Sequence, residues 1–114
     1  MEKRREQRIS VTLPVKYWKV HDGSAHTGMA FDITKRGFSL KGSGDLTIED
    51  TIHFELKMID RSVLGTAMIL WGSKPSGRAS AQRVGCLILS FAEDNMRILD
   101  EYLDRIMVVK VHDE

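Results

Sequence analysis

The sequence has one cysteine, two prolines and no long apolar run among its 114 residues. A single cysteine, Cys86, excludes an intramolecular disulfide and fits a reducing cytoplasm. No stretch approaches the roughly 20 apolar residues of a transmembrane helix, and the charged N-terminus lacks the apolar segment of a secretory signal. We therefore expect a cytoplasmic protein without membrane insertion, with Cys86 buried in its core.

An excess of charge of one sign is also missing. The formal net charge is +1, from 17 Lys and Arg against 16 Asp and Glu. Domains that bind a nucleic acid polymer are usually strongly basic, so we expect no such partner. The histidines and the cysteine lack metal-ligand spacing, and the sequence has no phosphate-binding loop or nucleophile elbow. It therefore predicts neither a metal site nor catalysis.

Apolar and polar residues alternate with a period of two in several segments, which indicates strands with one buried face. In 51–58, for example, Ile52, Phe54 and Leu56 are expected to point inward. Pro14 cannot donate to a ladder, so its strand is expected to be an edge there or to bulge. Strands are expected at residues 11–18, 25–31, 38–41, 51–58, 62–71 and 81–91, and turns at 21–24, 32–37, 42–45, 59–61 and 74–78.

The C-terminal part predicts one amphipathic helix at about residues 94–108, with Ser90 or Asp94 placed to cap it. Apolar residues recur there at helical spacing: Met96, Leu99, Tyr102, Leu103 and Ile106. The opposite face mixes both signs of charge, which argues against a membrane-surface helix. Short antiparallel strands followed by one helix predict a mainly β fold, a small closed antiparallel barrel whose end the apolar stripe covers.

Two short polar motifs precede and interrupt these strands. The first is the cationic segment 3–8, Lys-Arg-Arg-Glu-Gln-Arg, and the second is the turn-like segment 32–37, Asp-Ile-Thr-Lys-Arg-Gly. Taken singly, a charged terminus is usually just solvated, and Asp, Thr and Gly are ordinary turn residues. Guanidinium groups are nevertheless able to bind phosphate or the guanine edge bidentately and to stack on purines.

In this order, the two motifs resemble those of the PilZ domain, a bacterial receptor module for cyclic di-GMP. The family has an R-R-x-x-R arm and a later [D/N]-x-S-x-x-G turn, and strands similar to segments 64–71 and 83–91. The matching positions are Arg4, Arg5 and Arg8 in the arm, and Asp32, Thr34 and Gly37 in the turn. The resemblance covers nearly the whole chain and implies a β-barrel with a C-terminal helix.

The resemblance also implies roles for the matched residues. The arginines would bind phosphate and guanine, Asp32 would accept from the guanine edge or orient an arginine, and the Thr34 hydroxyl would donate to phosphate. Gly37 is expected to take a positive φ or to let the backbone approach the ligand. Threonine stands where the family usually has serine; it keeps the hydroxyl but adds a methyl group.

Three further positions are secondary ligand candidates: Lys3, Arg36 and Trp71. Lys3 directly precedes the arm, at a position that in the family influences whether one ligand or an intercalated pair is bound, and a cation there favours a pair. Arg36 extends a local cationic cluster in the turn. Trp71 corresponds to a region where some family members bring an aromatic side chain to the ligand.

Our leading hypothesis is a non-catalytic cyclic di-GMP receptor without a cofactor, monomeric or weakly dimeric. A flexible arm, residues 1–9, would become ordered on ligand against a single domain, residues 10–112, and signal to an unidentified downstream protein. One alternative is a PilZ-like adaptor that does not bind nucleotide, which Thr34 alone favours. The other is a barrel for single-stranded nucleic acid, for which only the segment 17–19, Tyr-Trp-Lys, is suggestive.

Overall fold

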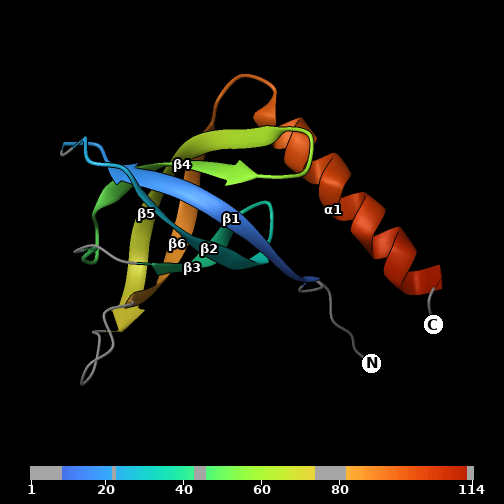
Figure 1. Cartoon of the computed structure of the whole chain (residues 1–114), viewed down its shortest axis with the longest axis horizontal. Helices are drawn as coiled ribbons and strands as arrows, with labels where there is room; N and C mark the ends of the chain where they lie inside the picture. The colour runs from blue at the N-terminus through green and yellow to red at the C-terminus, as the bar shows by residue number, and fades with distance from the viewer. Residues whose placement is uncertain (1–8, 22, 43–45, 74–81, 113–114) are drawn as a thin grey trace.

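The computed structural model describes residues 9–21, 23–42, 46–73 and 82–112 (Figure 1). Within them the elements are β1 (Ile9–Lys19), β2 (His26–Ile33), β3 (Gly37–Gly42), β4 (Thr51–Lys57), β5 (Ser62–Ser73), β6 (Gln82–Phe91) and α1 (Asn95–His112). The strands close into an antiparallel barrel in the order β1-β2-β3-β6-β5-β4. The predicted mainly β fold, a small barrel followed by one helix, is confirmed.

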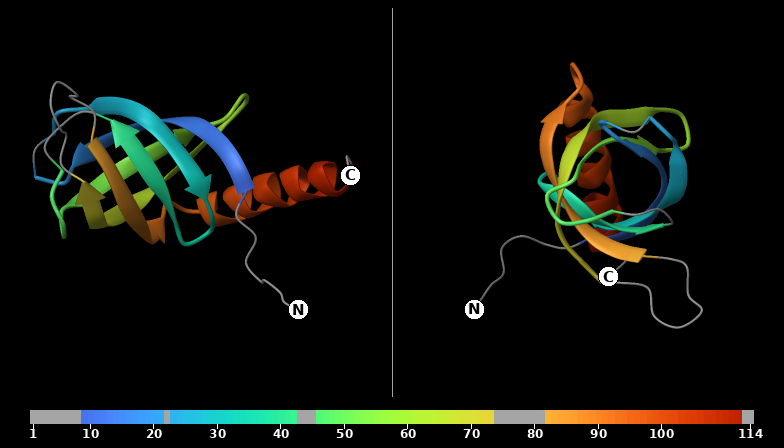
Figure 2. Two further views of the ribbon diagram at one scale, coloured as in Figure 1. Left: turned by 90° about the horizontal axis from the view of Figure 1, so that it is seen from below. Right: turned by 90° about the vertical axis from the view of Figure 1, so that its left-hand side faces the viewer.

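The barrel closes through two strand pairs that are distant in the sequence (Figure 2). Four hairpins join neighbours in the chain, but β1 also pairs with β4, as in Tyr17 opposite Phe54, and β3 pairs with β6, as in Phe38 opposite Cys86. Closure pairs every described strand with a neighbour on both sides over at least part of its length, which limits exposed strand edges. The antiparallel pairing of β1 with β2 places the start of β1 beside the end of β2, as in Ile9 opposite Ile33, and α1 contacts β1.

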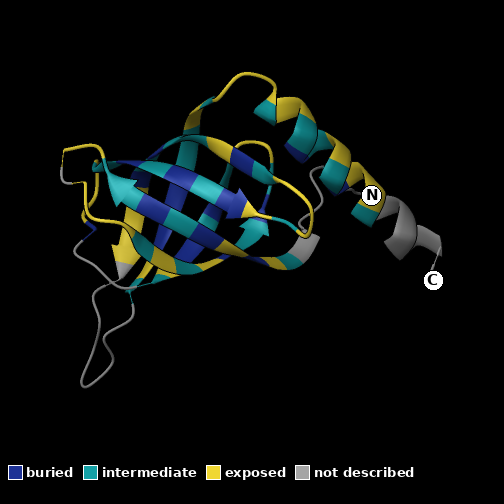
Figure 3. Cartoon of the chain, turned by 45° about the horizontal axis from the view of Figure 1, so that its top comes forward, coloured by how far each residue is buried: buried dark blue, intermediate teal, exposed yellow. Residues whose placement is uncertain are grey.

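Alternate residues of β1, β3 and β4, with apolar residues of the other strands, fill the barrel interior (Figure 3). Tyr17 and Phe54 are fully buried there, and the Phe38 ring meets the Phe54 ring edge-on at 5.2 Å between centroids. Burying an aromatic or large aliphatic side chain contributes about 1.5–3 kcal/mol, so these positions supply much of the stability. Cys86 lies in the same cluster, as expected, and burial raises the pKa of its thiol to about 12.

At Pro14, strand β1 is paired with β2 on one side but not with β4 on the other. It is opposite Met29 on β2, whereas the β1–β4 register begins at Val15 and runs to Lys19. The missing N–H of proline therefore interrupts no β1–β4 bond. This confirms the expectation that the strand is an edge at Pro14; the irregularity of the β1–β2 ladder falls earlier, between Ile9 and Thr12.

Helix α1 covers one end of the barrel, as the apolar stripe predicted. Leu99 and Leu103 are buried in the barrel core, and Tyr102 and Ile106 pack against it. Met96 does not belong to the buried stripe, because 51% of it is exposed. None of the described helices is long and apolar enough to cross a membrane.

The helix boundaries differ from the expected 94–108. The helix runs from Asn95 to His112, so the segment 108–111 extends it. Asp94 directly precedes it, and its carbonyl oxygen accepts from the N–H of Ile98 at 3.3 Å, as the residue that starts a helix does. Ser90 is not a cap, since it belongs to β6.

The strand boundaries differ from the expected ones by one or two residues, and two of these differences affect the motifs. Ile9 is the first residue of β1, so it belongs to the barrel and not to the arm. Asp32 and Ile33 are the last two residues of β2, so the segment 32–37 is not a turn throughout. Tertiary pairing extends these strands beyond the local turn signal, because a residue with a partner on the next strand gains a ladder bond.

Candidate functional site

The β2–β3 turn, residues 34–36, is shaped by the Thr34 side chain. Its hydroxyl oxygen accepts from the backbone N–H of Arg36 at 3.1 Å and of Gly37 at 3.2 Å. The Thr34 N–H donates to the Gly37 carbonyl at 2.9 Å, and the hydroxyl lies 3.4 Å from the same oxygen. A serine or threonine hydroxyl makes such a turn equally well. In this structure the Thr34 hydroxyl therefore organises the turn backbone.

Two contacts fasten the turn to the rest of the protein. The Arg36 carbonyl oxygen accepts from the N–H of Ile88 on β6 at 2.7 Å. The Lys35 ammonium lies 3.4 Å from the Asp100 carboxylate on α1. The side chains of Lys35 and Arg36 are exposed, so the tip of the turn presents two cations to solvent while its backbone is held.

Asp32 has an unusual backbone conformation, with φ at +53°. It lies within the irregular part of the β1–β2 ladder: Ile9 pairs with Ile33 and Thr12 with Phe31, so Asp32 alone faces two residues of β1. Asp and Asn adopt a positive φ more readily than other residues with a side chain. The extra residue of this β-bulge belongs to β1, opposite Asp32, and the bulge has no signal in the apolar alternation.

Gly37 does not take the positive φ that the sequence suggested. Among the described glycines only Gly23 does, at +91°. Instead, a Cβ atom on Gly37 would overlap the carbonyl oxygen of Cys86 on β6. The glycine is required by a close backbone approach, but the neighbour is the next strand of the barrel.

The arm residues Lys3, Arg4, Arg5 and Arg8 lie outside the described residues. The description begins at Ile9, whose Cα partner across the ladder is Ile33 on β2. Ile33 stands between the two motif residues Asp32 and Thr34. The first described residue of β1 is thus paired with the second residue of the second motif.

An outward-facing row next to the turn crosses four strands. Phe31 on β2 pairs with Ser39 on β3, Ser39 with Gly85 on β6, and Gly85 with Trp71 on β5. The Trp71 indole lies across Gly85, where a Cβ would overlap it, and 47% of Trp71 is exposed. The Arg83 guanidinium carbon lies 4.7 Å from the centroid of the Phe31 ring.

Sequence reasoning missed Phe31, Ser39, Arg83 and Asp100. Their neighbours in space come from strands or a helix far along the chain, so no local motif joins them. Trp71, a secondary candidate, belongs to the same outer row as Phe31, with two small residues between them. Among the described residues, no three His, Cys, Asp or Glu lie together as metal ligands.

Comparison with known proteins agrees with this architecture. The chain is similar in structure to the PilZ domain of CeSA from a cellulose-synthesizing bacterium, with 17% identity, a TM-score of 0.58, and coverage of 92% of this chain and 99% of that one. It is also similar to K. pneumonia MrkH in its apo state, with 12% identity and a TM-score of 0.77 over 100% of this chain and 56% of MrkH. The fold is therefore PilZ-like.

A third similar structure is the Bacillus subtilis inhibitor of motility MotI/DgrA, with 12% identity and a TM-score of 0.72 over 96% of this chain. The match covers 54% of MotI/DgrA, so this chain spans about half the length of both MotI/DgrA and MrkH. No protein-family model matches the sequence. No curated protein matches it either.

Proposed function

We propose that this protein is a cyclic di-GMP receptor whose ligand lies against the β2–β3 turn and is enclosed by the arginines of the arm. The pairing of Ile9 with Ile33 carries the proposal. Arg8 directly precedes Ile9 in the sequence, and consecutive Cα atoms are about 3.8 Å apart. The residue that follows the arm in the sequence is thus paired with a residue of the second motif, which supports a shared site for the two motifs.

The chemistry of the described turn suits an anion. Lys35 and Arg36 are exposed cations, and the Thr34 hydroxyl holds the turn backbone in one conformation. A preorganised turn loses little conformational freedom on binding, which favours affinity. Arginines of the arm would then bind the phosphates and guanine edges bidentately, and Asp32 would accept from guanine N–H groups or orient an arginine.

The row beside the turn offers surfaces for the bases. The exposed Trp71 indole could stack on one guanine, and the Arg83 guanidinium above Phe31 could stack or bind at its edge. Ser39 and Gly85, which lie between Phe31 and Trp71 in this row, have small side chains and leave room for a base between the two aromatic residues. The PilZ-like fold and the motif residues support the same ligand, and a cation at Lys3 favours an intercalated pair.

Ligand binding would order the arm and create a new surface near residues 1–10 and 32–37. A downstream protein in the cytoplasm would recognise that surface, and the domain itself would need neither catalysis nor a cofactor. Hydrogen exchange tests this order of events: cyclic di-GMP should protect amides of residues 1–10. Protection that rises only in α1 would show that the arm is not the switch.

Calorimetric titration with cyclic di-GMP tests binding itself, with GTP and cyclic di-AMP as controls. We expect low-micromolar affinity or better, about −8 kcal/mol or stronger. No heat and no spectral change at hundreds of micromolar ligand would favour the adaptor that does not bind nucleotide. The observed role of Thr34 weighs against that alternative, because serine and threonine supply the same hydroxyl to the turn.

A further inference from the structure

Strands β5 and β6 are unusually poor in charged residues. The segments 62–73 and 84–91 contain no Lys, Arg, Asp or Glu, although 29% of the whole chain is charged. An antiparallel strand with one solvated face normally alternates apolar and polar residues, whereas a nearly continuous apolar run is typical of a strand covered on both faces. The composition of β5 and β6 therefore indicates that their outer face is also covered.

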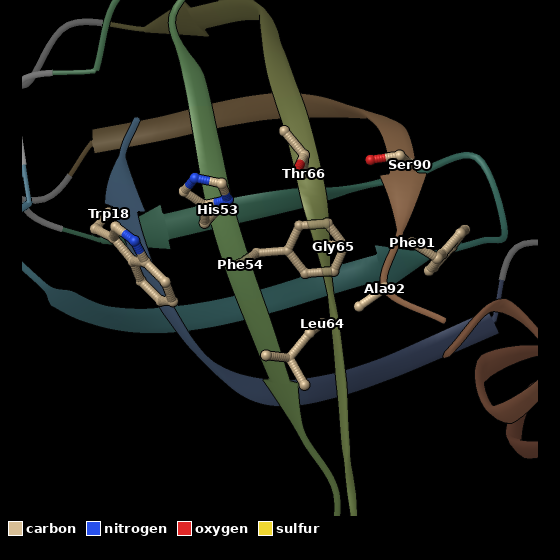
Figure 4. Close-up of a pocket in the computed structure, with 9 residues that line it drawn as sticks. All are labelled: Trp18, His53, Phe54, Leu64, Gly65, Thr66, Ser90, Phe91 and Ala92. Carbon is tan, nitrogen blue, oxygen red and sulfur yellow. The ribbon is translucent and has the colours of Figure 1, made fainter. Parts of the chain in front are cut away.

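The outward-facing apolar residues of these two strands form one surface, which we call the β5–β6 wall. Its members are half-buried or exposed: Leu64, Met68, Leu70, Leu87 and Leu89. Met68 pairs with Leu87, and neither belongs to the packed core of the barrel. Between these leucines, Thr66 and Ser90 border an open cavity of about 210 Å³, whose lining residues include no Lys, Arg, Asp or Glu (Figure 4). The wall is thus uncharged along both strands.

Two β-bulges, one in each strand, add leucines to the wall. Within the β5–β6 register each strand has one residue without a Cα partner, Leu70 in β5 and Leu89 in β6. Leu70 is 48% exposed and Leu89 is 50% exposed. Bulges redirect side chains and are common beside functional sites. Here both bulges turn a leucine towards solvent, which costs burial that the same residue would have in the barrel.

The two flanks of the wall carry opposite charges near the same end. On the β3 side, Lys41 is exposed and is in line with Ser73 of β5 through Arg83. On the β4 side, Glu49 is exposed, and its N–H donates to the carbonyl oxygen of Ile69. Within the described part of the chain, neither Lys41 nor Glu49 forms an ion pair. Each is therefore available to a charge of opposite sign on another molecule.

We propose that the β5–β6 wall is the interface of a two-fold dimer of this chain, with the axis parallel to the strands. A two-fold interface places a patch against its own copy, so a charged patch would repel itself and an uncharged apolar patch does not. Rotation about this axis lays the β3 flank of one copy over the β4 flank of the other. Lys41 of each copy then approaches Glu49 of the other copy, and the charges attract.

The size of the wall sets the strength of the dimer. Two strands of about eight residues, with half of each flanking strand, cover roughly 400 Å² on each copy. This is about half the area of a standard interface, so the dimer is weak, with a dissociation constant on the order of 100 µM. Trp71 borders the wall, so a nucleotide stacked on it and the second copy would exclude each other. The dimer therefore belongs to the protein without nucleotide.

Sedimentation equilibrium of the full chain without nucleotide tests the proposal, from about 10 µM to about 1 mM, a range around the expected dissociation constant. We expect a monomer–dimer equilibrium. Leu89→Glu or Leu70→Glu should weaken it about tenfold or more, because each places two carboxylates in the interface. Met29→Glu adds the same charge at a position that is 40% exposed on β2, across the barrel from β5, and should leave it unchanged. Melting temperatures check that each variant folds.

Exchange of the flank charges tests how the two copies are oriented. Lys41→Glu and Glu49→Lys should each weaken the dimer several-fold, because like charges then meet across the interface. The double variant should restore it, which an effect of either residue on its own chain would not do. A double variant as weak as the single ones would overturn the two-fold arrangement.

Three further results would overturn the proposal. The first is the absence of a dimer up to about 1 mM protein, well above the dissociation constant expected from the area. The second is association of Leu89→Glu as strong as that of the wild type, with the variant folded. The third is association that requires cyclic di-GMP, because the nucleotide would then bridge the two copies.

Discussion

The Lys35 ammonium lies 3.4 Å from the Asp100 carboxylate, and this ion pair joins the β2–β3 turn to helix α1. The two side chains are 57% and 44% exposed. An exposed pair of this kind contributes about 0.2–1 kcal/mol, so it biases the turn without fixing it. This ion pair therefore couples the β2–β3 turn weakly to helix α1.

Asp100→Asn should raise the affinity for cyclic di-GMP about two- to fivefold, because Lys35 would no longer be shared with a carboxylate; this corresponds to the free energy of an exposed ion pair. Titration calorimetry measures it. Asp104→Asn, one turn further along the helix, is the matched control and should have no effect. If Asp100→Asn leaves the affinity unchanged, Lys35 takes no part in binding.

Arg4→Ala or Arg8→Ala should each remove charge-assisted contacts to the ligand worth about 1.5–3 kcal/mol, roughly ten- to a hundredfold in affinity. Arg105→Ala removes the same charge from an exposed position of α1 and serves as the control. The melting temperature should stay nearly constant in all three variants. A large fall in melting temperature with unaltered affinity would mark the arm arginines as structural.

Thr34 should tolerate serine but not valine. Serine keeps the hydroxyl that accepts from the N–H groups of Arg36 and Gly37, whereas valine keeps the shape and loses it. We expect Thr34→Val to lower the free energy of unfolding by about 1–2 kcal/mol, as measured in urea, and to weaken ligand binding. Thr27→Val, at an exposed position of β2, is the control. Equal stability of the serine and valine variants would contradict this role.

Gly37→Ala should destabilise the barrel even without ligand. Its Cβ would overlap the Cys86 carbonyl oxygen, which belongs to backbone and cannot rotate away. We expect a loss of about 1–3 kcal/mol in the free energy of unfolding, typical of overpacking. Gly37→Val should lose more and bind ligand poorly. If the alanine variant is as stable as the wild type and loses only ligand binding, then glycine is needed at position 37 because the ligand approaches its backbone, not because Cys86 does.

Cys86 should be unreactive in the folded protein. Because burial raises the pKa of its thiol to about 12, the thiolate is scarce at pH 8, and Ellman's reagent should react slowly until denaturant is added. The unfolded thiol ionises near pH 8.5, so stability from this group is complete below that pH and declines as pH rises towards 12. Cys86→Ala should remove that part of the alkaline decline. Fast reaction in the native state would show that the core opens readily.

The alternation of apolar residues was enough to predict most strands and the class of fold. Burial of Ile52, Phe54 and Leu56 follows from a period of two, and burial of Leu99 and Leu103 from helical spacing. These patterns can be found in the local sequence, because the need to bury one face of a strand or helix determines where its apolar residues occur. Met96 fits the helical pattern but is 51% exposed, so spacing alone does not fix where the buried stripe begins.

The candidate site could be predicted only as two motifs. Neither the positive φ of Asp32 nor the β-bulge at Leu89 leaves a signal, since each depends on the register between two strands. The pairing of Ile9 with Ile33 likewise arises from strand order, and the Lys35–Asp100 contact from where the helix packs. These relationships are set by tertiary structure, which overrides local preference.

The β1–β4 register begins only at Val15, so two parts of β1 are held in different ways. From Val15 to Lys19, β1 is joined to β4 by a backbone ladder. Helix α1 contacts both β1 and β5, and its residues Leu99 and Leu103 supply side-chain packing there. Packing of this kind can part without breaking any β1–β4 hydrogen bond. We therefore expect local opening of the barrel to begin at the end where β1 starts, before the Val15–Lys19 ladder opens.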